Sequence, residues 1–149
     1  MTIFLNNETV QQQLHVASDR AGTWRVVASD VNENLSQTMF VNADHYVATV
    51  LAHNVPVLMY AGDADLMCNW KGVEAWMVAL PWPGRDAFNS APGVPFIVEG
   101  TTAGELRTAG PLSFLRIFNS GHMVPTDQPV VALAMLNRFI HQTPLTSHE

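Results

Sequence analysis

Two apolar runs, each followed directly by a polar turn, constrain the fold of this chain more than any other feature. The run Val55–Met59 leads into the acidic turn Gly62–Asp65. The run Phe114–Phe118 leads into the turn Asn119–His122. The first run is unbroken and bounded by proline and glycine, which is typical of a strand buried on both faces of a sheet. The sequence therefore predicts one such buried strand and a second strand, whose ends carry first a pair of carboxylates and then a histidine.

The remaining apolar spacing predicts helices and further strands around these two. Asn69 can cap a helix in which Val73, Trp76 and Leu80 share one face, and the prolines that follow end that helix. The expected helices are 6–16, 43–52, 69–80 and 127–140, and the expected strands are 55–60, 95–98, 105–108 and 113–118. This order of elements predicts an α/β fold with at least one sheet edge that no other element covers.

The composition indicates a chain with more apolar surface than it can bury alone. Of its 149 residues, 48% are hydrophobic and 13% are charged, whereas a typical soluble domain has roughly 25% charged residues. Self-association or strand exchange is therefore expected. The net charge of −6, with scattered Lys and Arg, argues against a nucleic-acid partner. No apolar stretch approaches the ~20 residues of a membrane span, so no membrane partner is expected.

His122 and the acids that precede it in the chain are the candidates for chemistry. An imidazole on a turn can act as a general base, and a carboxylate can fix its tautomer. The residue types leave both Asp63 and Asp65 open as the acid, and either can be a simple turn former. No His-Glu-x-x-His motif or cysteine pair accompanies them, so neither a metal nor a cofactor is expected. An unpaired cysteine among apolar residues is more often a small buried apolar residue than a nucleophile, and Cys68 is interpreted as a residue that lines a pocket.

Five sequence blocks, taken in order, carry a family resemblance. They are Phe4–Asn7, Val57–Asp65, Cys68–Trp70, Gly121–Pro125, and Asp127 with the apolar helix that follows it. The chain thereby resembles the C-terminal part of the serine carboxypeptidases. The resemblance implies the C-terminal portion of an α/β-hydrolase fold, with an incomplete sheet flanked by helices. It implies one segment, 1–149, in which residues 1–45 end a cap or insertion region and residues 46–149 hold the last strands and helices.

The resemblance also implies a function and a set of site residues. Serine carboxypeptidases release C-terminal residues from peptides at acidic pH through a Ser-Asp-His mechanism, in a lysosome, a vacuole or outside the cell. The family motifs place the catalytic acid at Asp65 and the catalytic base at His122, and substrate-pocket residues at Met67, Cys68 and Met123. The family's Gly-Glu-Ser-Tyr-Ala-Gly turn does not occur in this sequence. The chain is therefore expected to be inactive alone and to need, as its partner, the N-terminal part of the same enzyme, which carries the serine.

Two other interpretations stay open at this stage. An acyltransferase on the same scaffold would share Asp65 and His122, and a non-catalytic interaction module would have lost the nucleophile. The sequons at Asn7 and Asn34 are expected glycosylation sites and favour a secretory route slightly.

Overall fold

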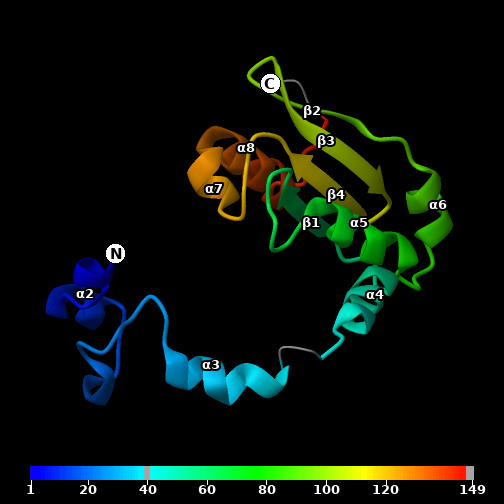
Figure 1. The fold of residues 1–149 in the computed structure, drawn as a ribbon. Coiled ribbons are helices and arrows are strands. Elements are labelled where there is room, and N and C mark those ends of the chain that lie inside the picture. Colours follow the sequence, from blue (N-terminus) through cyan, green and yellow to red (C-terminus); the bar gives the residue numbers. More distant parts are fainter. Residues whose placement is uncertain (39–40, 147–149) are drawn as a thin grey trace. The chain divides into compact units, whose positions relative to one another are not determined.

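The computed structural model describes residues 1–38 and 41–146, and the chain divides into two compact units, Met1–Asn42 and Ala43–Glu149 (Figure 1). The first unit holds the helices α1 (Thr2–Leu5), α2 (Glu8–Gln13) and α3 (Ser29–Leu35) and the 3-10 helices η1 (Ser18–Arg20) and η2 (Ser36–Thr38). Hydrogen bonds of side-chain amide groups hold the first residues of this unit in place. Asn7 caps α2 by accepting the N–H groups of Thr9 and Val10, and buried Gln11 donates to the Leu5 carbonyl. Among the described residues of this unit, no hydrophobic side chain is buried.

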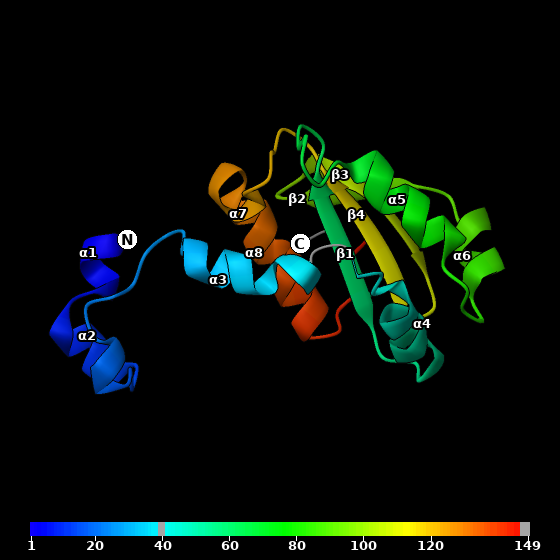
Figure 2. The ribbon, with the colours of Figure 1, turned by 60° about the horizontal axis from the view of Figure 1, so that its bottom comes forward.

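The second unit is a four-stranded sheet with helices on both faces (Figure 2). Its elements are α4 (Asp44–Ala52), β1 (Val57–Gly62), α5 (Trp70–Ala79), α6 (Arg85–Ser90), β2 (Val94–Val98), β3 (Thr101–Ala109), β4 (Leu112–Ile117), α7 (Val124–Asp127) and α8 (Pro129–Ile140). The strand order is β1-β4-β3-β2, in which β1 and β4 are parallel and the other neighbours are antiparallel. The two parallel strands are the two apolar runs that the sequence singles out.

Strand β4 lies between two hydrophobic clusters. Leu115 and Ile117 belong to the cluster that includes residues of α8. Leu112 and Phe114 belong to the cluster that includes residues of α4, α5 and α6. Successive side chains of a strand point to opposite faces, so one strand contributes to both clusters. The burial on both faces that the sequence predicts is for the run 55–60, which forms β1, and it is met only in part, because β1 is an edge strand on which Tyr60 is exposed.

The element boundaries differ from the expected ones for local reasons. The helix expected at 6–16 is only α2, Glu8–Gln13, because Asn7 is its N-cap and His15 takes a positive φ of 56°. The helix expected at 127–140 is α8, which begins at Pro129, and the unexpected short helix α7 precedes it, because Gln128 between them has a non-helical backbone with a φ of −133° and a ψ of 64°. Strand β1 runs two residues further than expected, to Gly62. Helices α3 and α6 were not predicted, since neither shows the apolar periodicity of a long amphipathic helix.

Strand β1 has an unpaired edge within the described part of the chain. It forms one end of the sheet, where the Val57 N–H donates to the carbonyl of Pro111 just before β4, and the N–H of Asp63, just after β1, donates to the carbonyl of Ile117 in β4. By the alternation along a strand, the N–H groups of Leu58 and Tyr60 point to the other side. An edge of this kind can pair with a strand of another chain. No helix in the described residues is long and apolar enough to cross a membrane.

We predict that the chain associates through this edge of β1. Light scattering should give an apparent mass that rises with protein concentration. Tyr60→Lys should lower the association, because Tyr60 is exposed on β1 and a lysine on an edge strand opposes strand pairing. Thr102→Lys adds the same charge to β3, which has a strand on each side, and it should leave the association unchanged. A concentration-independent monomer would contradict the prediction.

Candidate active site

The turn after β1 holds the Asp65 side chain in one orientation. Asp65 Oδ1 accepts the backbone N–H groups of Met67 at 2.8 Å and Cys68 at 3.1 Å. A short acidic side chain that bonds the backbone two and three residues ahead is a standard way to fix a tight turn. The side chain is only 5% exposed. One carboxylate oxygen is therefore used by the turn, and the other remains available for a further partner.

The loop after β4 presents His122 to solvent. Asn119 begins this loop with a φ of 55°, a left-handed conformation that asparagine tolerates better than most residues. The backbone N–H of Gly121 donates to Asp127 Oδ2 at 2.8 Å, which ties the loop to α7. The imidazole of His122 is 60% exposed. The loop is thus held at its backbone, while the ring stays accessible.

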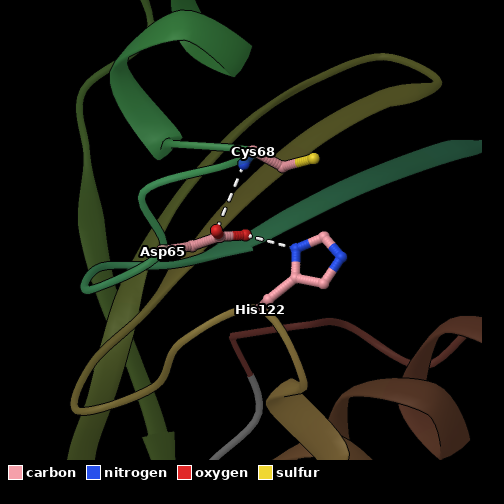
Figure 3. Close-up of side chains that lie close together, drawn as sticks. All are labelled: Asp65, Cys68 and His122. Carbon is pink, nitrogen blue, oxygen red and sulfur yellow. Dashed lines mark hydrogen bonds and ion pairs between the residues drawn. The ribbon is translucent and has the colours of Figure 1, made fainter.

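The two loops meet at the Asp65–His122 pair (Figure 3). Asp65 Oδ2 lies 2.9 Å from His122 Nδ1, and this contact is the one that the sequence predicts. Asp63, the other candidate acid, instead accepts the backbone N–H of Ser120 at 3.4 Å. Asp63 therefore joins the two loops, and Asp65 is the acid that orients the histidine.

The charge of the Asp65 carboxylate determines which ring nitrogen of His122 carries the proton. The hydrogen bond to His122 holds the pKa of the Asp65 carboxyl below its usual value, and the N–H groups of Cys68 and Met67 act in the same direction against the opposing effect of burial. A charged carboxylate can only accept, so His122 Nδ1 must be the donor. In the neutral imidazole this leaves Nε2 as the acceptor. The geometry therefore gives His122 a basic nitrogen that faces away from Asp65.

The close approach of the two loops depends on Gly62 at the end of β1. Parallel pairing of β1 with β4 aligns Gly62 with Ile117, so both strands end at the same edge of the sheet. The N–H of Ala64 donates to the Ser120 carbonyl at 2.9 Å. A Cβ atom on Gly62 would overlap the carbonyl oxygens of Ser120 and Gly121. The absence of a side chain at this position lets the two loops touch.

The expected pocket residues surround the pair but do not enclose it. Met67 is 82% exposed and Met123 is 61% exposed. Cys68 is exposed, and its role as a pocket residue stays a prediction. Its thiol lies near the Asp65 carboxylate and the His122 ring, with one possible metal-binding atom of each residue within 4.8 Å of the others.

The two sequon asparagines lie on the surface of the first unit. Asn7 and Asn34 are both exposed. Asn7 Oδ1 already accepts hydrogen bonds as the N-cap of α2. Their glycosylation stays a prediction.

Comparison with known proteins identifies the class of protein to which this fold and site belong. Residues 1–142 match the family model described as serine carboxypeptidase, and the chain belongs to that family. It is 37% identical over 140 residues to serine carboxypeptidase-like 47 of Arabidopsis thaliana, which covers 94% of this chain and 27% of that protein. It is 44% identical over 114 residues to carboxypeptidase Y homolog A of Pyrenophora tritici-repentis, which covers 74% of this chain and 21% of that protein.

A solved structure shows the same fold. The prohormone-processing carboxypeptidase KEX1(delta)p of Saccharomyces cerevisiae matches with a TM-score of 0.75 and 25% sequence identity, over 93% of this chain and 30% of that one. The predicted α/β-hydrolase portion is thereby confirmed. The chain spans about a quarter of the length of the curated relatives, with shares of 27%, 21% and 26% in three of them.

Replacing Gly62 by alanine should destabilise the second unit and separate the two loops. The added methyl group must displace backbone carbonyl oxygens, and overpacking of this kind costs about 1 to 3 kcal/mol. Urea unfolding should show this loss. Gly72→Ala is the matched control, because its Cβ would meet ordinary contacts inside α5 and a helical Gly→Ala change stabilises by roughly 0.5 to 1 kcal/mol. Equal stability of the two variants would contradict the account.

The lowered pKa of Asp65 predicts a pH dependence of stability. The stabilisation by this carboxylate is complete above the usual carboxyl pKa of 3.8 and is lost as the pH falls through the lower pKa of the folded chain. The difference in unfolding free energy between the parent chain and Asp65→Asn should therefore shrink as the pH falls below that value. Asp86→Asn, which removes an exposed carboxylate of α6, controls for the charge change. A difference independent of pH would contradict the assignment.

Proposed function

We propose that this chain supplies the acid and the base of a serine-type carboxypeptidase, which releases C-terminal residues from peptides at acidic pH. The single observation that carries the proposal is the Asp65–His122 hydrogen bond at 2.9 Å. An aspartate that orients the proximal nitrogen of a histidine leaves the distal nitrogen to accept a proton from a hydroxyl. Membership of the serine carboxypeptidase family supports the choice of a serine hydroxyl and of a peptide substrate.

Each residue has a defined part in the proposed reaction. His122 Nε2 takes the serine proton as the hydroxyl attacks the last peptide bond, and it returns the proton to the leaving amine. Asp65 stabilises the imidazolium while that proton is held. The low pKa of the Asp65 carboxyl supports work at acidic pH, because the carboxylate keeps its charge there. Met67, Cys68 and Met123 contribute to the wall of the substrate pocket.

The serine comes from a part of the polypeptide that this sequence does not contain. No Gly-x-Ser-x-Gly turn occurs among the 149 residues. Removing one member of such a catalytic set costs nearly as much as removing all of them. The chain by itself is therefore inactive, and its partner is the N-terminal part of the same enzyme. We place the complete enzyme in a lysosome, in a vacuole or outside the cell.

A chimera tests the proposal. This chain replaces the matching segment of carboxypeptidase Y homolog A from Pyrenophora tritici-repentis, to which it is 44% identical. The folded chimera should cleave a blocked dipeptide at acidic pH, and the 149-residue chain alone should not. His122→Ala should lower kcat/KM of the chimera by at least about 10³-fold, because the serine loses its base. His53→Ala, an exposed histidine after α4, should have no effect.

Four outcomes would count against the proposal. Turnover by the isolated chain would show that it does not need a serine from elsewhere. A folded chimera that keeps its activity after His122→Ala would show that His122 is not the catalytic base. A chimera that transfers acyl groups from acyl-glucose to an alcohol but does not cleave peptides would favour the acyltransferase, and a folded chimera without either activity would favour the interaction module.

A further inference from the structure

Cys68 adds a third metal-binding group to the Asp65–His122 pair. The Cys68 sulfur, an Asp65 carboxylate oxygen and a His122 ring nitrogen lie within 4.8 Å of one another (Figure 3). The catalytic chemistry proposed for the family uses the carboxylate and the imidazole but gives the thiol no role in proton transfer. The thiol and the imidazole are both exposed, so a solute can reach them.

The backbone keeps the three groups near one another. Asp65 Oδ1 accepts the N–H of Cys68, so the carboxylate and the cysteine belong to the same turn. Asp65 Oδ2 is not used by that turn and already lies 2.9 Å from His122 Nδ1. The loop that carries His122 is tied to α7 through Gly121 and Asp127. Two loops fixed by hydrogen bonds therefore hold the three metal-binding groups near one another.

We propose that Asp65, Cys68 and His122 form a binding site for Zn²⁺, with a water molecule as the fourth ligand. Zinc takes cysteine sulfur at about 2.3 Å and histidine nitrogen or carboxylate oxygen at about 2.0 to 2.2 Å, so its ligand atoms lie roughly 3 to 4 Å apart. The exposed side chains of Cys68 and His122 can close the remaining distance by small rotations. On binding, the thiol gives up its proton to water, and the neutral imidazole carries its proton on Nε2 instead of Nδ1, so that Nδ1 is free to coordinate. The thiolate and the carboxylate together balance the two charges of the ion.

Occupation of this site and use of the histidine as a base exclude each other. When the His122 imidazole coordinates the ion, the Asp65 carboxylate no longer sets its orientation. The ion also occupies the space beside the Asp65–His122 pair. Zn²⁺ is therefore a reversible inhibitor of the complete enzyme and not its cofactor. This consequence rests on the proposed function, whereas binding of the ion to the chain does not. From the sequence no metal site is expected, because the spacing of known metal-binding motifs is absent. Motif spacing gives no information on the closeness of Cys68 and His122, which lie far apart in the chain.

Metal titration of the 149-residue chain tests the site. Co²⁺ is the spectroscopic probe, because a tetrahedral site with a thiolate gives strong visible bands and a sulfur-to-cobalt charge-transfer band, and Zn²⁺ should displace it with a stoichiometry of one. Cys68→Ser should abolish the charge-transfer band. Cys68→Ser and His122→Ala should each weaken Zn²⁺ binding by at least about 10-fold. His53→Ala should bind as the parent chain does, because His53 is exposed and lies outside the cluster.

A second measurement covers variants that fold poorly. Cys68 is the single cysteine, so its alkylation by iodoacetamide can be followed by mass spectrometry in the parent chain. Zn²⁺ should slow this alkylation, and the protection should be much smaller in a His122→Ala chain whose circular dichroism matches the parent. Absence of Zn²⁺ binding by the folded parent chain, or binding and protection unchanged by His122→Ala, would overturn the site. An inactive chimera that still binds Zn²⁺ would contradict only the proposed function.

Discussion

The parallel pairing of β1 with β4 is the constraint on which the candidate site depends. It aligns Gly62 with Ile117 and so brings the turn after each strand to the same edge of the sheet. Because Gly62 has no side chain, the backbones of the two turns can come into contact. The N–H of Ala64 donates a hydrogen bond to the Ser120 carbonyl across this contact. The 2.9 Å contact between Asp65 and His122 is the result of this strand geometry. The side chains of Asp65 and His122 supply the chemistry, and the pairing of β1 with β4 sets the distance between them.

The second unit separates a rigid supporting core from an accessible site. Strand β4 is packed between two hydrophobic clusters, and Leu115 and Leu112 are fully buried on its opposite faces. The turns after β1 and β4 carry exposed apolar side chains instead, including Met67 and Met123. Exposed apolar residues around a polar pair suit a surface that another segment of polypeptide covers. This agrees with a chain that spans about a quarter of its curated relatives, 27% in one of them.

The sequence predicts those parts of the fold that depend on local pattern. The apolar runs at 55–60 and 113–118 predict the strands that the structure has at 57–62 and 112–117, and the family resemblance of the motifs predicts which acid contacts His122. The distance between the Cys68 thiol and the His122 ring does not follow from local pattern, because it depends on the contact of two loops far apart in the chain, and only the family resemblance places Cys68 near the site. Helix α6 and the division between α7 and α8 were missed because short helices at proline and glycine turns lack a repeating apolar face. Strand order depends on long-range pairing, for which the sequence offers no local signal.

The central claim is that the Asp65–His122 pair, built by this chain, serves a serine hydroxyl contributed by another part of the enzyme. A crystal structure of the folded chimera measures this most directly. The account predicts that His122 Nδ1 stays on Asp65 and that Nε2 lies about 2.6 to 3.2 Å from a serine hydroxyl of the fused segment. A structure in which that serine lies beyond the reach of His122, or in which another acid holds the imidazole, would contradict it.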